Sequence, residues 1–140
     1  METKGSFAPA TVEEARDRYA EAGEAARVVV RETAKAMGFD GAEYDERVTG
    51  EVIETARDAL FASLLTVHVA DRETFEAWVD EREFTPEQVT VLGSEHVDNV
   101  VWHAAPFADA VVAATFQNEP EAAAGTLRRN AFGRIYRDAL

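Results

Sequence analysis

Three histidines, His68, His96 and His103, are the residues of this chain best suited to bind a metal. Three imidazole nitrogens and a water form the ligand set of a catalytic zinc site. Acids close in sequence could orient the rings. The spacing itself is not diagnostic, because the chain has no His-Glu-x-x-His pattern. Two interpretations stay open: a metal-assisted hydrolase that holds a divalent metal at these side chains, or three partly buried histidines that each form a structural hydrogen bond.

A second candidate site is a group of arginines near the end of an otherwise acidic chain. Arg128, Arg129 and Arg134, with Arg137 close behind, could bind a phosphate or carboxylate, because guanidinium groups present a fork of donors to such oxygens. The alternative is structural. Cations near a helix C-terminus oppose the helix dipole, and arginines pair with acids of a neighbouring helix. Binding of a small anion at these arginines is therefore one of the alternative functions that the sequence predicts.

Patterns for nucleophilic catalysis are weak. The chain has no cysteine, and its serines are Ser6, Ser63 and Ser94. None lies in a Gly-x-Ser-x-Gly elbow, and no glycine-rich phosphate loop is present. We therefore favour a non-enzymatic binding or interaction module over an enzyme.

The helices that must carry these residues are marked by caps. Thr11-Val12-Glu13-Glu14 has the pattern of a capping box, and Gly38 is a typical residue to end the helix that follows. Between them, apolar residues recur at steps of three and four, which predicts one long amphipathic helix. Asp40 begins a second cap, and its helical stripe continues to Leu65. The short turn between the two helices predicts an antiparallel pair.

The middle of the chain changes to β-type patterns. Residues 66–69 favour a short strand, and Asp71 can cap a short helix after it. Thr85-Pro86-Glu87-Gln88 fits a capping box with proline at the first helical position. Valines in the segments 89–91 and 97–101 predict two further strands. Residues 107–116, rich in alanine and valine, predict a buried helix, and a last helix is expected from residue 120.

The resulting fold prediction is α+β and predominantly helical. We expect two helical pairs that form a helical bundle, with a small antiparallel or mixed sheet inserted between them. Residues 1–10 are predicted to be a flexible N-terminal arm and residues 11–140 a single helix-rich globular domain. Wide apolar stripes on the first two helices also allow a homodimer.

Charge is the most informative global feature. There are 27 acidic and 14 basic residues, for a formal net charge of −13, and Lys4 and Lys35 are the only lysines. Such a charge destabilises a compact chain in dilute buffer. In molar salt the Debye length falls to about 3 Å, which screens that repulsion. The sequence therefore predicts a halophilic protein whose acidic surface binds cations and water, and it argues against nucleic-acid binding.

The chain is also expected to be cytoplasmic. No apolar run approaches the ~18 residues of a membrane span, and no signal-peptide pattern opens the sequence.

Several stretches are similar to members of an uncharacterised haloarchaeal protein family, a domain of unknown function. The stretches that carry this resemblance are Val28–Glu32, Phe61–Leu65, Gly93–Val100, Trp102–Ala104, Pro106–Asp109, Gly125–Arg129 and Ala131–Arg137. They span most of the chain. The resemblance implies no activity, cofactor or catalytic residue, and it agrees with the halophilic interpretation.

Overall fold

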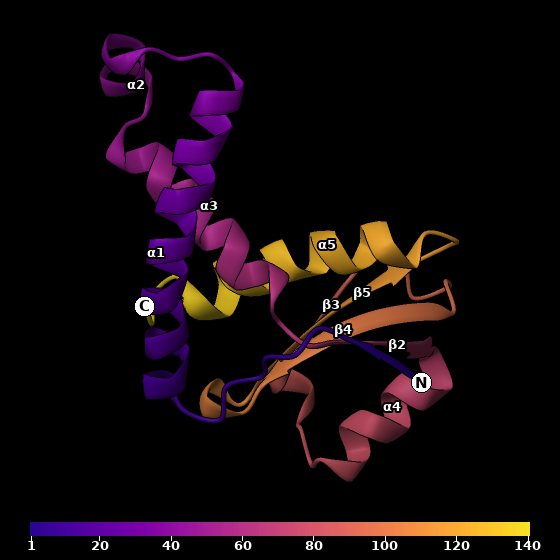
Figure 1. Cartoon of the computed structure of the whole chain (residues 1–140). Helices are drawn as coiled ribbons and strands as arrows, with labels where there is room; N and C mark the ends of the chain where they lie inside the picture. Colours follow the sequence, from indigo (N-terminus) through magenta and orange to yellow (C-terminus); the bar gives the residue numbers. More distant parts are fainter.

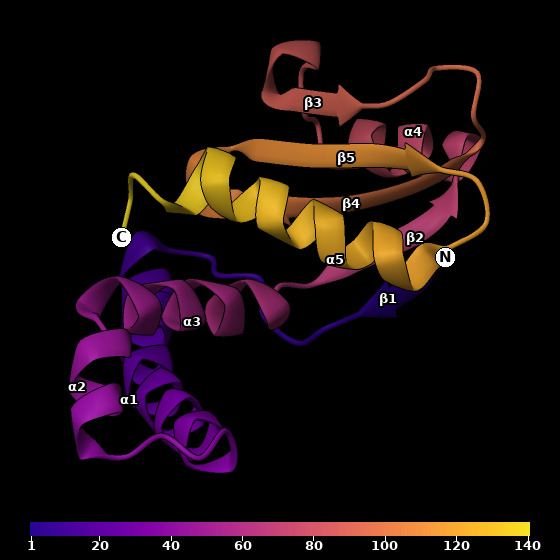
Figure 2. The ribbon, with the colours of Figure 1, turned by 90° about the horizontal axis from the view of Figure 1, so that it is seen from above.

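A five-stranded mixed sheet lies at the centre of the molecule (Figures 1 and 2). The computed structural model describes all 140 residues. Its strands are β1 (Glu2–Lys4), β2 (Val67–Asp71), β3 (Val89–Leu92), β4 (Asn99–Ala105) and β5 (Ala110–Phe116). They are arranged in the order β1-β2-β4-β5-β3, and only the β3–β5 pair is parallel. The two edges of the sheet are therefore β1 and β3.

Helices cover both faces of this sheet. They are α1 (Val12–Ala36), α2 (Gly41–Arg47), α3 (Gly50–Ser63), α4 (Arg72–Glu81) and α5 (Pro120–Ala131), with 3-10 turns at Pro86–Gln88 and Pro106–Ala108 and a π-helical turn at Phe132–Tyr136. In Figure 1, α5 lies on one face of the sheet and α4 on the other. The hairpin of α1 and α3 packs beside α5, and its distal half projects past the sheet together with α2 (Figure 1). None of the helices combines the length and apolarity needed to span a bilayer.

Strand β4 separates two cores, because successive side chains of a strand point to opposite faces. Val101 and Ala105 contribute to the core under α5, while Val100 and Trp102 contribute to the core under α4. The core under α5 is the larger. It joins the sheet to α1, α3 and α5 through buried residues that include Phe61, Leu127 and Tyr136.

The α+β class and the helical character of the prediction are confirmed, with 56% of residues in helices and 20% in strands. The helical bundle is not. Residues 107–116, which we predict as a buried helix, contain the internal strand β5 instead. Both faces of β5 are covered, so its sequence is apolar apart from Thr115 and lacks the alternation that distinguishes a half-exposed strand. Without this helix, the second helical pair does not form, and α5 packs on the sheet.

The caps behave largely as predicted. The Thr11 and Asp40 side chains accept hydrogen bonds from the backbone of Glu14 and Glu43, and Asp71 caps α4 in the same way. One predicted helix is broken, however. The segment from Asp40 to Leu65 divides into α2 and α3, because the Thr49 hydroxyl accepts from the Val52 amide and begins a new helix.

Residues 1–10, which we predict to be a flexible arm, contain the edge strand β1 and a following segment that inserts Phe7 into the core. Strand β1 pairs with β2 in antiparallel register, Thr3 opposite His68. The amides of Ser6 and Phe7 donate to the Leu64 carbonyl, at 3.1 and 3.0 Å. The Phe7 ring is buried against α3.

Candidate functional site

The three histidines lie in three different environments. His68 is directly opposite Trp102 in the β2–β4 register, so these two side chains share the face covered by α4. His103 follows Trp102 on the same strand and therefore points to the other face, towards α5. His96 lies in the exposed loop between β3 and β4, with Nε2 3.9 Å from the Glu95 carboxylate. The fold does not bring these imidazoles together, and no group of three or more His, Asp or Glu side chains has an arrangement that could hold a metal ion.

His103 is fully buried and bonded at both ring nitrogens. Its Nδ1 lies 2.6 Å from the Thr66 carbonyl oxygen and its Nε2 lies 2.7 Å from the Tyr136 hydroxyl. A carbonyl can only accept, so Nδ1 carries the proton and Nε2 accepts from Tyr136. Burial lowers the pKa of His103 to about 4 and raises the pKa of Tyr136. This network therefore holds a neutral imidazole in the core and leaves no free nitrogen for a substrate or a metal.

His68 is half-buried among aromatic rings. The centres of the Trp78 and Trp102 rings lie 5.4 and 5.5 Å from the imidazole centre, and Nδ1 lies 3.1 Å from the Thr3 hydroxyl. Burial, and secondarily the charge of Arg82, lower the pKa of His68. The histidine thus ties the edge strand β1 to the aromatic cluster under α4.

The predicted arginine cluster also separates. Arg128 turns towards the sheet, where its Nε donates to the Leu65 carbonyl at 2.9 Å. Arg134 lines a hollow at the other end of the sheet, beside Gln88 and Thr90. Arg129 lines a groove between α3 and the end of the chain, and Arg137 lines it as well. Arg128, Arg129 and Arg134 therefore do not share one site, whereas Arg129 and Arg137 do.

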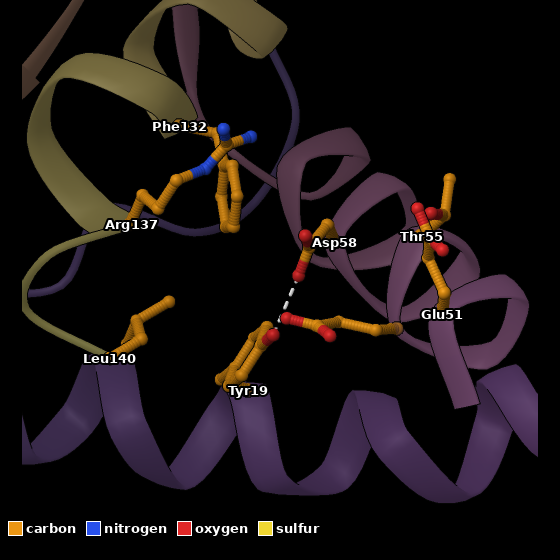
Figure 3. A pocket seen from close by; sticks show the side chains of 8 residues that line it. Tyr19, Glu51, Thr55, Asp58, Phe132, Arg137 and Leu140 are labelled. Atoms are coloured by element: carbon orange, nitrogen blue, oxygen red, sulfur yellow. Dashed lines mark hydrogen bonds between the residues drawn. The ribbon is translucent and has the colours of Figure 1, made fainter.

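Figure 3 shows part of this groove. It consists of two adjoining hollows of about 390 and 250 Å³. Both hollows are lined by Thr55, Asp58, Phe132 and Arg137, so they are two parts of one surface. The first also reaches Tyr19 of α1 and Leu140 (Figure 3). We call this surface the charged groove.

Tyr19 and Asp58 form the one hydrogen bond across the floor of the charged groove. The Tyr19 hydroxyl donates to Asp58 Oδ1 at 2.6 Å (Figure 3). Burial, and then the bond to Asp58, raise the pKa of Tyr19 to about 12, so the phenol stays protonated at neutral pH. The Arg57 guanidinium lies 3.9 Å from the centre of the Tyr19 ring and its Nε donates to the Tyr19 carbonyl. Tyr19 is therefore a fixed donor and a poor base.

The groove carries charges of both signs that do not pair with each other. Glu51, Glu54 and Asp58 follow one another on α3 at steps of three and four, which places them on one face of that helix. Arg129 and Arg137 belong to the opposite wall. No ion pair joins an acid of α3 to either arginine, and the Arg137 guanidinium lies 5.5 Å from the centre of the Phe132 ring instead. Both arginines are exposed and available to a ligand.

Local structure explains how the second wall is built. After α5 the chain continues as a π-helical turn, in which the Arg137 amide donates to the Phe132 carbonyl at 2.9 Å. A π-helical turn has more residues per turn than an α-helix and shifts the following side chains around the axis. The sequence analysis named Arg129 and Arg137 among the candidate arginines, but it did not point to Tyr19 or Asp58. The spacing of Glu51, Glu54 and Asp58 in the sequence indicates a shared helix face, and this face is only one wall of the groove.

Comparison with known proteins places the chain in one family. The model of a family of unknown function, DUF5809, matches residues 6–137. The match covers nearly the whole chain, so the protein belongs to that family. No curated protein and no solved structure matches it.

Proposed function

We propose that this member of a family of unknown function is a non-enzymatic binding module that holds a small zwitterionic ligand in the charged groove. The observation that carries the proposal is the pair of walls with opposite charge and no ion pair between them. Opposite charges that line one groove normally pair where the geometry allows. Here the ligand would complete both sets of contacts.

The chemistry of each wall defines the ligand. Arg129 and Arg137 offer guanidinium donors, which bind a carboxylate or a phosphate. Across the groove, Glu51, Glu54 and Asp58 are acceptors suited to an ammonium group. An amino acid, or a compound with the same two charges, fits this division. A simple anion fits less well, because three carboxylates lie nearby and repel it.

The absence of a poised nucleophile supports binding rather than catalysis. The groove offers Thr55 as a hydroxyl nucleophile, but the histidine of the core is buried elsewhere with both nitrogens engaged. Tyr19, with its raised pKa, does not act as a base at neutral pH. The Thr55 hydroxyl forms no hydrogen bond with the carboxylates that line the groove beside it, so no base is positioned to activate it.

Thermal unfolding with and without added ligand tests this proposal. The probes are glycine, acetate, methylammonium and inorganic phosphate. A bound ligand raises the unfolding temperature by an amount that grows with the ratio of its concentration to its Kd. We expect glycine to stabilise the protein more than acetate or methylammonium does. Arg137→Ala should remove that difference. Arg134→Ala is the matched control, because Arg134 is an exposed arginine of the same segment outside the groove.

Equal stabilisation by glycine and by salts of matched ionic strength would count against the groove as a zwitterion site. Stabilisation by phosphate or acetate alone, lost in Arg129→Ala and Arg137→Ala, would replace the zwitterion with a simple anion. If Arg134→Ala abolishes binding while Arg137→Ala does not, the site lies in the other hollow.

We also propose that the protein is adapted to concentrated salt. All but two of its 27 acidic residues are exposed, and the exceptions, Glu43 and Asp58, are half-buried. Few of them are neutralised, since the basic side chains of the five lysine or arginine ion pairs contact only Glu2, Glu21, Glu32 and Glu121. The remaining carboxylates face water and repel one another, and this repulsion weakens as salt screens it.

Unfolding by urea in 0.1 to 3 M KCl measures this adaptation. The free energy of unfolding should rise steeply with KCl, and most of the rise should occur as the Debye length falls from about 10 Å towards 3 Å. A variant with several exposed acids of α1 changed to glutamine, for example Glu13, Asp17 and Glu24, should depend less on salt. A wild-type stability that is flat across this range would contradict the proposal.

A further inference from the structure

The two edges of the sheet are unequally protected. Edge strand β1 carries Glu2 and Lys4, and Lys4 forms ion pairs with Glu2 and Glu121. Charged side chains on an edge discourage pairing with other strands. The other edge, β3, has the sequence Val-Thr-Val-Leu and no charge. It pairs with β5 on one side only, and no backbone hydrogen bond outside that pairing involves residues 90–92.

An apolar groove runs beside this unprotected edge. It has a volume of about 400 Å³ and lies between α4 and β3. Its apolar lining residues are Phe75, Val79, Phe84, Pro86, Val89 and Val91. Val91 is 40% exposed, although it is a valine of a strand. We call this surface the β3 groove; Figure 2 shows β3 at the free edge of the sheet with α4 behind it.

The charge of the β3 groove has one sign. Glu76 and Asp80 of α4 are the only charged residues that line it, and they are four residues apart on one side of the helix. Arg82, which directly follows α4, lies over the Trp78 ring at 4.1 Å and is not part of the lining. An occupant is therefore favoured when it combines an apolar group with a positive charge.

A second copy of this chain does not meet that requirement. Pairing of two β3 edges would bring Glu76 and Asp80 of each copy towards the same acids of the other, on chains that each carry a net charge of −13. Like charges at close range disfavour such a contact. The occupant is instead a partner of opposite charge.

We infer that the β3 groove binds an extended basic peptide segment of a partner protein, which adds to β3 as a sixth strand. Backbone hydrogen bonds to the free edge would supply affinity that is independent of sequence, and the groove would supply the specificity. Side chains two positions apart on a strand share a face. The segment should therefore present an apolar side chain to Val91 and lysine or arginine two residues away, towards Glu76 and Asp80.

A blocked synthetic peptide tests this inference directly. The probe is Thr-Lys-Thr-Leu-Thr-Lys-Thr with a fluorophore at one end, titrated with the whole protein and followed by anisotropy at the lowest salt that keeps the protein folded. Binding to the wild type should weaken about 10-fold or more in Val91→Lys. Thr90→Lys is the matched control. It adds the same charge to the same strand on the opposite face, and we expect affinity within about 2-fold of the wild type.

Two further peptides separate strand addition from simple charge attraction. Replacement of the threonines by proline keeps the charges and removes alternate backbone donors, so binding should be lost. Replacement of both lysines by glutamate should abolish binding through repulsion. Equal affinity for the proline peptide, equal effects of Val91→Lys and Thr90→Lys, or no binding of the lysine peptide would each overturn the inference. A concentration-dependent dimer that Val91→Lys dissociates would assign the edge to a second copy and overturn it as well.

Discussion

Trp102 and His103 are neighbours on β4, yet they belong to two very different cores. Under α5, His103 is buried with both ring nitrogens bonded, to Thr66 and Tyr136. Under α4, the indole nitrogens of Trp78 and Trp102 are buried without a hydrogen-bond partner. The aromatic rings there meet edge to face instead, with the Trp78 and Trp102 centres 5.7 Å apart at an interplanar angle of 63°. Ring edges against π faces are a weaker substitute for a true acceptor.

This difference indicates how the molecule divides its tasks. The α5 face is a large core with a satisfied polar network, and it fixes α1, α3 and the C-terminal turn that form the charged groove. The α4 face is a small cluster beside a free sheet edge. Unsatisfied polar groups and few neighbours make a region less stable locally. We therefore expect the α5 face to determine global stability and the α4 face to open more easily.

The largest expected effect comes from removing one anchor on each face. Trp102→Ala and Leu127→Ala should each lower the free energy of unfolding by about 3–5 kcal/mol, because both leave a cavity in a buried core. Their local consequences should differ. Trp102→Ala should accelerate amide hydrogen exchange mainly in α4, whose contacts are with β2 and β4. Leu127→Ala should accelerate exchange throughout the sheet. The same exchange pattern in both variants would remove the distinction between the faces.

A smaller effect, confined to mildly acidic pH, isolates the polar network. The pKa of His103 is about 4 in the folded protein and 6.5 for an unperturbed histidine, so between these pH values the unfolded chain binds more protons. Stability from this group is complete above pH 6.5 and is lost as pH falls towards 4, by about 3 kcal/mol in total. His68, whose pKa is also lowered, acts in the same direction. Urea unfolding at pH 7, 6 and 5 measures the loss.

His103→Gln separates this contribution from the carboxylates. Protonation of the acidic surface relieves repulsion in wild type and variant alike, so the difference between them reports His103. We expect the difference in free energy of unfolding between the wild type and His103→Gln to become smaller as pH falls from 7 to 5. A difference that stays constant with pH would mean that the pKa of His103 is the same in the folded and unfolded protein. That result would contradict a buried, neutral imidazole.

The smallest effect concerns a single hydroxyl on the α5 face. Tyr136→Phe leaves Nε2 of His103 buried without a donor and should cost about 1–3 kcal/mol. Tyr44→Phe is the control. Tyr44 is half-buried and its hydroxyl has no hydrogen bond within the protein, so we expect a change within about 0.5 kcal/mol. If Tyr136→Phe lowers the free energy of unfolding by less than the control limit of about 0.5 kcal/mol, the Tyr136 hydroxyl contributes little to stability. That result would weaken the contrast with the unsatisfied indole nitrogens of the α4 face.

Local features of the fold were predictable from the sequence because they depend on contacts within a few residues. Thr11, Asp40 and Asp71 mark helix starts through their own side chains, and each accepts the predicted backbone bond. The Thr85 capping box with Pro86 is formed as expected. The valine-rich segments at 89 and 99 form strands. Family membership was likewise visible in the residues, although the haloarchaeal origin and the halophilic character stay predictions.

Other features were decided only by the tertiary structure. A mainly apolar run such as Ala110–Phe116 is typical both of a buried helix and of a strand that is covered on both faces. The sequence of the run therefore could not distinguish these two structures. The separation of the histidines follows from the β2–β4 register, because a shift of one residue moves a side chain to the opposite face. The charged groove unites Tyr19, Asp58 and Arg137, which are distant along the chain. Only packing of α1, α3 and the π-helical turn brings them to one surface.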